Sequence, residues 1–117
     1  MRHHRYNPDF KFVIEPEDFD KYSDKELLQY CLGSTMYMPG TKDFTSKILN
    51  DETPGLTSMV FCFEDACPEE LVDDAEKNVL QTLDCLSSAL DDGRLTYDTL
   101  PLIFCRVRNQ QHIISRL

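Results

Sequence analysis

Short apolar runs alternate with amphipathic stretches over most of the chain. Residues 34–38, 58–63 and 102–107 are short and apolar; 58–63 is apolar throughout, and the third run ends in charge at Arg106. That pattern is typical of parallel strands covered on both faces. Residues 43–50 and 69–90 carry apolar side chains at helical spacing, and the stripe on the second stretch is expected to lie in the core. The order predicts an α/β fold with a β-α-β-α-β parallel sheet.

Local signals predict where the helices begin and end. Ser23 and Glu26 form a capping box, so a short helix is expected to run from there to about Leu32. Pro68 stands where the first turn of a helix tolerates proline. Gly93 is expected to close the long helix that follows.

The two ends of the chain complete a single predicted domain over residues 1–117. Residues 1–33 are expected to form an N-terminal arm and the short helix, and residues 34–117 the β-α-β-α-β unit with the start of a further helix. That further helix is predicted to begin near Gln110 and to continue to Leu117. The arm is expected to pack over a sheet edge or barrel end through aromatic side chains, namely Tyr6, Phe10, Phe12, Phe19 and Tyr22.

The charge balance excludes one large class of partner. Asp and Glu number 21 against 12 Lys and Arg, which gives a net charge of −9. A nucleic-acid-binding module needs a basic surface, and the basic opening residues Arg2, His3, His4 and Arg5 are too few to form one. No apolar run approaches the roughly 20 residues that span a bilayer. The expectation is therefore a cytoplasmic protein without nucleic-acid or membrane partners.

The cysteines favour a reducing compartment. They are odd in number and contain no C-x-x-C pair: Cys31, Cys62, Cys67, Cys85 and Cys105. Cys62, Cys85 and Cys105 stand inside apolar patterns, where a thiol acts as a small hydrophobic group. Cys67 precedes a predicted helix whose dipole could lower its pKa. No general base is adjacent in sequence, so a nucleophilic role is disfavoured, and the spacings do not resemble a zinc site.

Chemically capable residues follow all three predicted strands. They are Pro39, Gly40, Glu64, Asp65, Arg106 and Arg108. Because parallel α/β folds bind ligands beyond the carboxyl ends of their strands, we expect these residues on one rim. Carboxylates can hold Mg²⁺, and Arg106 and Arg108 are suited to grip a carboxylate or phosphate. Alternatively, Glu64 simply pairs with Arg106.

Two other features favour structural interpretations. Pro39-Gly40 lacks the glycine pattern of phosphate-binding loops, which favours a plain turn. His112 has no evident partner nearby in the sequence, so it is expected to cap or decorate the last helix.

Three segments carry a resemblance to a known superfamily: YMPGTKDFTSKIL, SMVFCFEDACPEELVDDAEKNV and LPLIFCRVRN. Together they resemble the citrate lyase β-subunit and HpcH/HpaI aldolase superfamily. Within it, they are similar to the C–C bond lyase group of the TIM-barrel fold that is found in tellurite-resistance and stress gene clusters. The combination of an EDA tripeptide after an apolar strand, a PG turn before it and RVR after it carries the resemblance.

The resemblance implies a (β/α)8 barrel that cleaves or forms carbon–carbon bonds next to a carbonyl, with Mg²⁺ as the cofactor. The implied substrate is a small oxo- or hydroxy-acid, as the free acid or as a CoA thioester. Arg106 matches the arginine that grips the substrate's carboxylate or carbonyl. Glu64 and Asp65 match an acidic pair close to the metal and its waters, while the direct metal ligands are expected from later strands. Pro39 and Gly40 match a turn on the same rim.

Two positions depart from the superfamily pattern. Gly33-Ser34 stand where an arginine is usual, and Ala75-Glu76 stand where an Ala-Arg step is usual. Length departs as well, because a TIM barrel needs about 200 residues or more.

The sequence therefore predicts the N-terminal part of a lyase-like barrel that is incomplete and inactive alone. It would be a fragment, a truncated gene product, or a piece completed by association. The alternative is a non-catalytic α/β interaction module that associates through its exposed sheet edge. A Rossmann-type nucleotide binder would share the order of elements, but the glycine fingerprint is missing.

Overall fold

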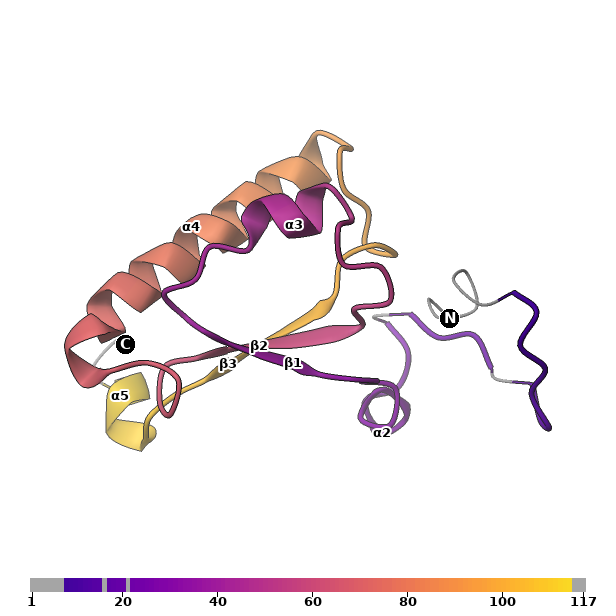
Figure 1. Cartoon of the computed structure of the whole chain (residues 1–117), viewed down its shortest axis with the longest axis horizontal. Coiled ribbons are helices and arrows are strands. Elements are labelled where there is room, and N and C mark those ends of the chain that lie inside the picture. The colour runs from indigo at the N-terminus through magenta and orange to yellow at the C-terminus, as the bar shows by residue number, and fades with distance from the viewer. Residues whose placement is uncertain (1–7, 16, 21, 115–117) are drawn as a thin grey trace.

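A three-stranded parallel sheet forms the centre of the structure (Figure 1). The computed structural model describes residues 8–15, 17–20 and 22–114. The strands are β1 (Met36–Pro39), β2 (Ser58–Cys62) and β3 (Leu102–Arg106), in the order β1-β2-β3. The helices are α2 (Lys25–Leu28), α3 (Thr45–Leu49), the 3-10 turn η1 (Glu69–Leu71), α4 (Val72–Asp91) and α5 (Gln110–Ile114). The predicted β-α-β-α-β order is confirmed.

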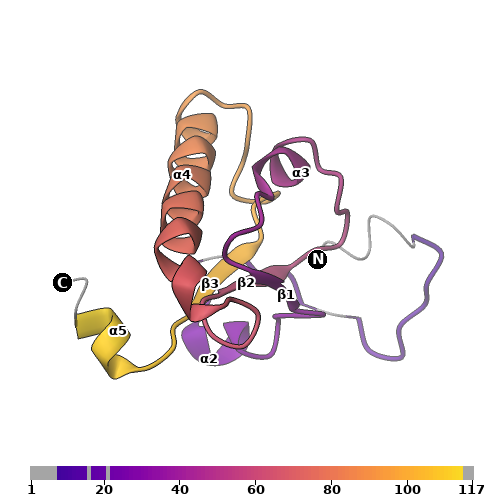
Figure 2. The same ribbon diagram turned by 60° about the vertical axis from the view of Figure 1, so that its left-hand side comes forward.

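Helices α3 and α4 lie on one face of the sheet, and α2 lies on the other side, below the start of β1 (Figures 1 and 2). The core fills the space between the sheet and α4. Met59 and Phe61 of β2 are fully buried there, in one cluster with Ala75, Val79 and Leu86 of α4. Strand β2 is buried at every position, as its apolar sequence predicts. Its neighbours on both edges and the helices above it remove its side chains from water.

The face of the sheet turned away from α3 and α4 is only partly covered. Tyr37, Val60 and Phe104 are register partners across the three strands, so they share this face. Val60 is buried in the middle, but Tyr37 is 59% exposed and Phe104 is 43% exposed. The prediction that 102–107 forms a strand buried on both faces is therefore wrong for β3. Among the described residues, β3 pairs with a strand on one side only, which leaves its outer edge open.

The short helix begins one residue later and ends sooner than predicted. The N-cap of α2 is Asp24, whose carboxylate accepts a hydrogen bond from the Glu26 N–H at 2.7 Å. Ser23 instead belongs to a turn, in which its hydroxyl accepts from the Asp20 N–H at 3.0 Å. The helix ends at Leu28 rather than near Leu32. Either residue type can cap a helix, and here the aspartate does so.

The long helix differs from its prediction at two positions of its stripe. It opens with the turn η1 after Pro68 and continues as α4 to Asp91, just before Gly93. Leu71 and Leu83, which the stripe places in the core, are exposed. Thr82 is buried instead, and its hydroxyl accepts a hydrogen bond from Thr45 Oγ1 at 3.1 Å. This bond satisfies the buried polar group and ties α4 to α3.

The arm and two of the cysteines are more exposed than expected. Phe10 and Tyr22 are exposed rather than packed over the sheet, and the arm extends beyond one end of the molecule (Figure 1). Cys62 is buried as predicted, but Cys85 and Cys105 are exposed. The basic residues 2–5, Tyr6 and the end of the last predicted helix, residues 115–117, lie outside the described residues.

Candidate functional site at the carboxyl ends of the strands

Arg106, Glu64 and Asp65 meet at the rim where the strands end. Arg106 is the last residue of β3, and the two acids lie in the loop that follows β2. Arg106 Nη2 lies 2.6 Å from Glu64 Oε2, and Arg106 Nη1 lies 2.9 Å from Asp65 Oδ2. The Phe63 N–H donates to the Arg106 carbonyl at 2.9 Å, which continues the β2–β3 pairing to this point. The structure thus brings together three of the predicted site residues, with Glu64 paired to Arg106 as the alternative interpretation expects.

The cluster is open to solvent and strongly charged. The Arg106 side chain is 40% exposed, so a small molecule can reach it. Loss of hydration lowers the pKa of Arg106, but the carboxylates of Asp65 and Glu64 outweigh this and hold the pKa above its ordinary value. Arg106 is therefore a permanent cation with both carboxylates already on its guanidinium.

Pro39 and Gly40 lie on the same rim, at the end of β1. Pro39 is the last residue of the strand, and the Gly40 N–H donates to the Cys62 carbonyl at 3.0 Å. A Cβ at Gly40 would lie 2.8 Å from Cε1 of Phe63 and 3.0 Å from Cβ of Ala75. Close packing between strand and helix therefore requires glycine at this position.

Asn78 fixes the same turn and was not among the predicted residues. Its Nδ2 donates to the Gly40 carbonyl at 2.7 Å from α4. An asparagine on a predicted amphipathic helix carries no signal of such a contact, because its partner is 38 residues away in the sequence.

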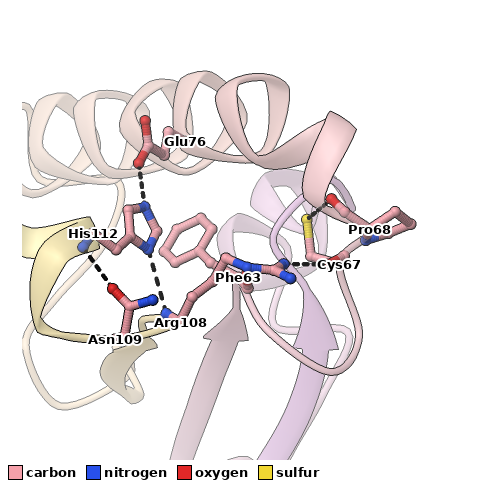
Figure 3. A network of polar contacts seen from close by, with 7 residues as sticks. All are labelled: Phe63, Cys67, Pro68, Glu76, Arg108, Asn109 and His112. Carbon is pink, nitrogen blue, oxygen red and sulfur yellow. Dashed lines mark hydrogen bonds and ion pairs between the residues drawn. The ribbon is translucent and has the colours of Figure 1, made fainter. Parts of the chain in front are cut away.

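The guanidinium of Arg108 binds the main chain near Cys67 (Figure 3). Its Nη1 donates to the carbonyls of Phe63, at 3.2 Å, and Cys67, at 3.0 Å. These two residues flank the acidic loop, residues 64–66. Arg108 Nη1 is therefore already engaged with the protein itself. That Arg108 binds substrate stays a prediction.

His112 has the partner that the sequence did not reveal. Its Nε2 lies 2.6 Å from Glu76 Oε1 of α4, and its Nδ1 accepts from the Arg108 N–H at 3.3 Å (Figure 3). Asn109 caps α5 by accepting from the His112 N–H at 2.9 Å. The expectation that His112 caps or decorates the last helix is confirmed in part, because its Nδ1 accepts from a main-chain N–H just before α5. Decoration alone is wrong, because the ring also pairs with Glu76. This contact joins α5 to α4, and the two partners are 36 positions apart in the sequence.

Cys67 is a poor nucleophile in this setting. Burial raises the pKa of its thiol, and this outweighs the nearby positive charge of Arg108, which lowers it. The Sγ lies 3.5 Å from the Pro68 carbonyl, to which the thiol donates. The predicted lowering of its pKa by a helix dipole is wrong. The turn after Pro68 is a short 3-10 turn, and the thiol is turned into the core.

The described residues do not form a metal site by themselves. Within 8–15, 17–20 and 22–114, no group of three or more His, Cys, Asp or Glu side chains is placed to hold a metal ion. Glu64 and Asp65 are oxygen donors of the kind that Mg²⁺ takes, but both lie on Arg106. Among the helices of the described part, none is long and apolar enough to cross a membrane.

Comparison with known proteins assigns the family. A family model described as C–C bond lyase of the TIM-barrel fold matches residues 26–117. The chain belongs to this family. No curated protein and no solved structure matches it significantly. Membership in the C–C bond lyase family agrees with the observed order of elements, because parallel strands separated by helices are the repeating unit of a TIM barrel. The predicted α/β class is thereby confirmed.

Proposed function

We propose that Arg106 binds the carboxylate or carbonyl oxygen of a small oxo- or hydroxy-acid in a carbon–carbon bond lyase site. The observation that carries the proposal is the Arg106 cluster at the strand ends, with both carboxylates within 2.9 Å of the guanidinium. The family name supports the reaction class. The position supports the site, since TIM-barrel active sites lie at the carboxyl ends of the strands.

The chemistry needs a cation beside an oxygen. When the carbon–carbon bond next to a carbonyl breaks, its electron pair forms an enolate, and the negative charge collects on the carbonyl oxygen. A guanidinium that faces this oxygen stabilises that charge, and Glu64 and Asp65 hold the guanidinium in place beforehand. By resemblance, Mg²⁺ would polarise the same carbonyl when bound. We propose that its direct ligands come from residues outside these three strands.

The surface beside the rim favours a free acid over a CoA thioester. An open hollow of about 510 Å³ lies next to Arg108 and His112, and its walls include three acidic side chains, those of Glu69, Glu70 and Asp73. CoA carries several phosphate charges, which carboxylates repel. A small oxo- or hydroxy-acid needs only the contact with Arg106.

The proposal is tested by enolate formation from a simple probe. The protein expressed from its complete reading frame is incubated with pyruvate in D₂O, with and without MgCl₂, and loss of the methyl proton signal is followed by NMR. Arg106→Gln is expected to slow this exchange about a hundredfold, the usual effect of removing a donor to a developing oxyanion. Arg94→Gln is the matched control, because Arg94 is also exposed and ion-paired, with Asp92 at the end of α4.

Exchange at the wild-type rate in Arg106→Gln would overturn the assignment of Arg106. Exchange that is equal with and without MgCl₂ would overturn the Mg²⁺ part alone. Faster turnover of a CoA thioester than of the free acid would overturn the substrate class.

Association through the exposed sheet edge is a second candidate function, favoured by the open outer edge of β3 and by the exposed side chain of Phe104 on that strand. We propose it as the alternative to catalysis, and light scattering together with thermal unfolding tests the association itself. A monomer with sharp, cooperative melting contradicts association. In either case we propose a cytoplasmic location, because all five cysteines are free.

A further inference from the structure

The acidic loop, residues 64–66, is bound at both of its ends by one nitrogen atom. Phe63 precedes the loop and Cys67 follows it, and both carbonyls accept from Arg108 Nη1. Phe63 and Cys67 are themselves buried, so water cannot readily replace a lost donor. A further turn bond closes the loop, from the Cys67 N–H to the Glu64 carbonyl at 3.0 Å.

A terminal guanidinium nitrogen suits this arrangement. It carries two hydrogens, so each carbonyl receives a separate charge-assisted hydrogen bond. The two bonds fix the separation of Phe63 and Cys67, and thereby the path of the three residues between them. Glu64 and Asp65 can then present both carboxylates to Arg106 at 2.6 and 2.9 Å.

The main chain of Arg108 is fixed from the opposite side. Its N–H donates to His112 Nδ1, which leaves Nε2 of that ring as the donor to Glu76 of α4. The His112 ring also packs edge-on against Phe63, with centroids 5.9 Å apart. Figure 3 shows these groups as one connected network between α4, α5 and the acidic loop.

We propose that Arg108 is a positioning residue of the rim. Its Nη1 contacts with Phe63 and Cys67, which we call the Arg108 clasp, hold the acidic loop so that Glu64 and Asp65 orient Arg106. The role of Arg106 rests on the proposed function, but the clasp can be measured without any ligand. This assignment differs from direct substrate binding, since it requires the guanidinium to stay on the main chain.

The test follows the loop itself in the ligand-free protein. Amide hydrogen exchange at Cys67 and the NMR signal of the Arg106 Nε–H group are measured in wild type, Arg108→Gln and Arg108→Lys. Arg108→Gln is expected to speed Cys67 exchange about tenfold and to shift the Arg106 signal toward that of an unpaired arginine. Arg108→Lys keeps the charge and is expected to restore part of both effects.

Controls separate the clasp from general stability. Exchange in the middle of α4 should not change in Arg108→Gln, and Arg94→Gln should leave both rim signals unchanged. If Arg108→Gln does not fold, His112→Gln tests the same network, since it removes the acceptor of the Arg108 N–H, and a smaller change of the same sign is expected.

Three results decide between the possibilities. Unchanged Cys67 exchange and an unchanged Arg106 signal in folded Arg108→Gln would overturn the clasp. A uniform rise in exchange over the whole chain would also overturn it, because that indicates a stabilising role only. Altered rim signals in Arg108→Gln, together with pyruvate exchange that does not depend on Arg106, would uphold the clasp and overturn the proposed function.

Discussion

Replacing Gly40 by alanine tests the packing at the rim. The added Cβ would lie 2.8 Å from the Phe63 ring and 3.0 Å from Ala75 Cβ, and both neighbours are buried. Such overpacking forces the neighbouring groups to shift and lowers the free energy of unfolding by about 1–3 kcal/mol. Alanine also restricts the unfolded chain, which offsets about 0.4–1 kcal/mol. Gly40 does not have a positive φ, so backbone strain adds nothing. The expected net loss is therefore about 1–2 kcal/mol.

The loss is measured by urea unfolding, and the melting temperature should fall by about 5–10 °C. A double-mutant cycle with Phe63→Leu isolates the cause, because a smaller side chain at Phe63 should recover part of the loss. Gly93→Ala is the control. Gly93 has φ +77° and no atom within 4 Å of its added Cβ, so its cost comes from the backbone and should not couple to Phe63→Leu. Wild-type stability in Gly40→Ala, or the absence of coupling, would refute the packing argument.

Two further predictions concern titratable groups. At pH 8, Cys85 should react with iodoacetamide at least about ten times faster than Cys67, because burial raises the pKa of the Cys67 thiol and hides it; equal rates measured by mass spectrometry would contradict this. The hydrogen bond from the Thr45 N–H lowers the pKa of the Asp43 carboxyl from its ordinary value of 3.8. The ionised carboxylate therefore stabilises the folded state above pH 3.8, and this stabilisation is lost as the pH falls through the lowered pKa. The difference between Asp43→Asn and wild type in urea unfolding should therefore be largest at pH 6 and shrink as the pH falls below 3.8, whereas a constant difference would exclude the linkage.

The fold could be predicted where burial and local pattern agree. Strand β2 is apolar and buried throughout, so its pattern and its position in the sheet carry the same information. Strand β3 has the same kind of sequence but an open edge, and the sequence of a strand does not state how many neighbours it has. The burial of Thr82 and the exposure of Leu83 were not predictable for a similar reason. The side of α4 that is covered at this turn depends on where α3 lies, because Thr45 of α3 contacts Thr82.

The sequence predicted which residues lie at the candidate site but not most of the contacts that they make there. Parallel strands bring their carboxyl ends to one edge, so topology alone predicts that Glu64 and Arg106 meet. The contacts of His112 with Glu76, and of Asn78 with the Gly40 carbonyl, join residues 36 and 38 positions apart. No local spacing rule reaches so far, and the residue types by themselves favour an exposed helix face.

Arg106 and Arg108 show why residue type alone could not separate the two roles. Both are arginines near the end of one strand, yet one guanidinium binds two carboxylates and the other binds two main-chain carbonyls. The Phe63 N–H, which donates to the Arg106 carbonyl, ties both roles to the same stretch of chain. Because this bond and the Arg108 clasp both depend on how β3 lies against β2, a shift of β3 would move the acidic loop and its cation together. The orientation of Arg106 is therefore a property of the β2–β3 pairing as much as of its own carboxylate partners.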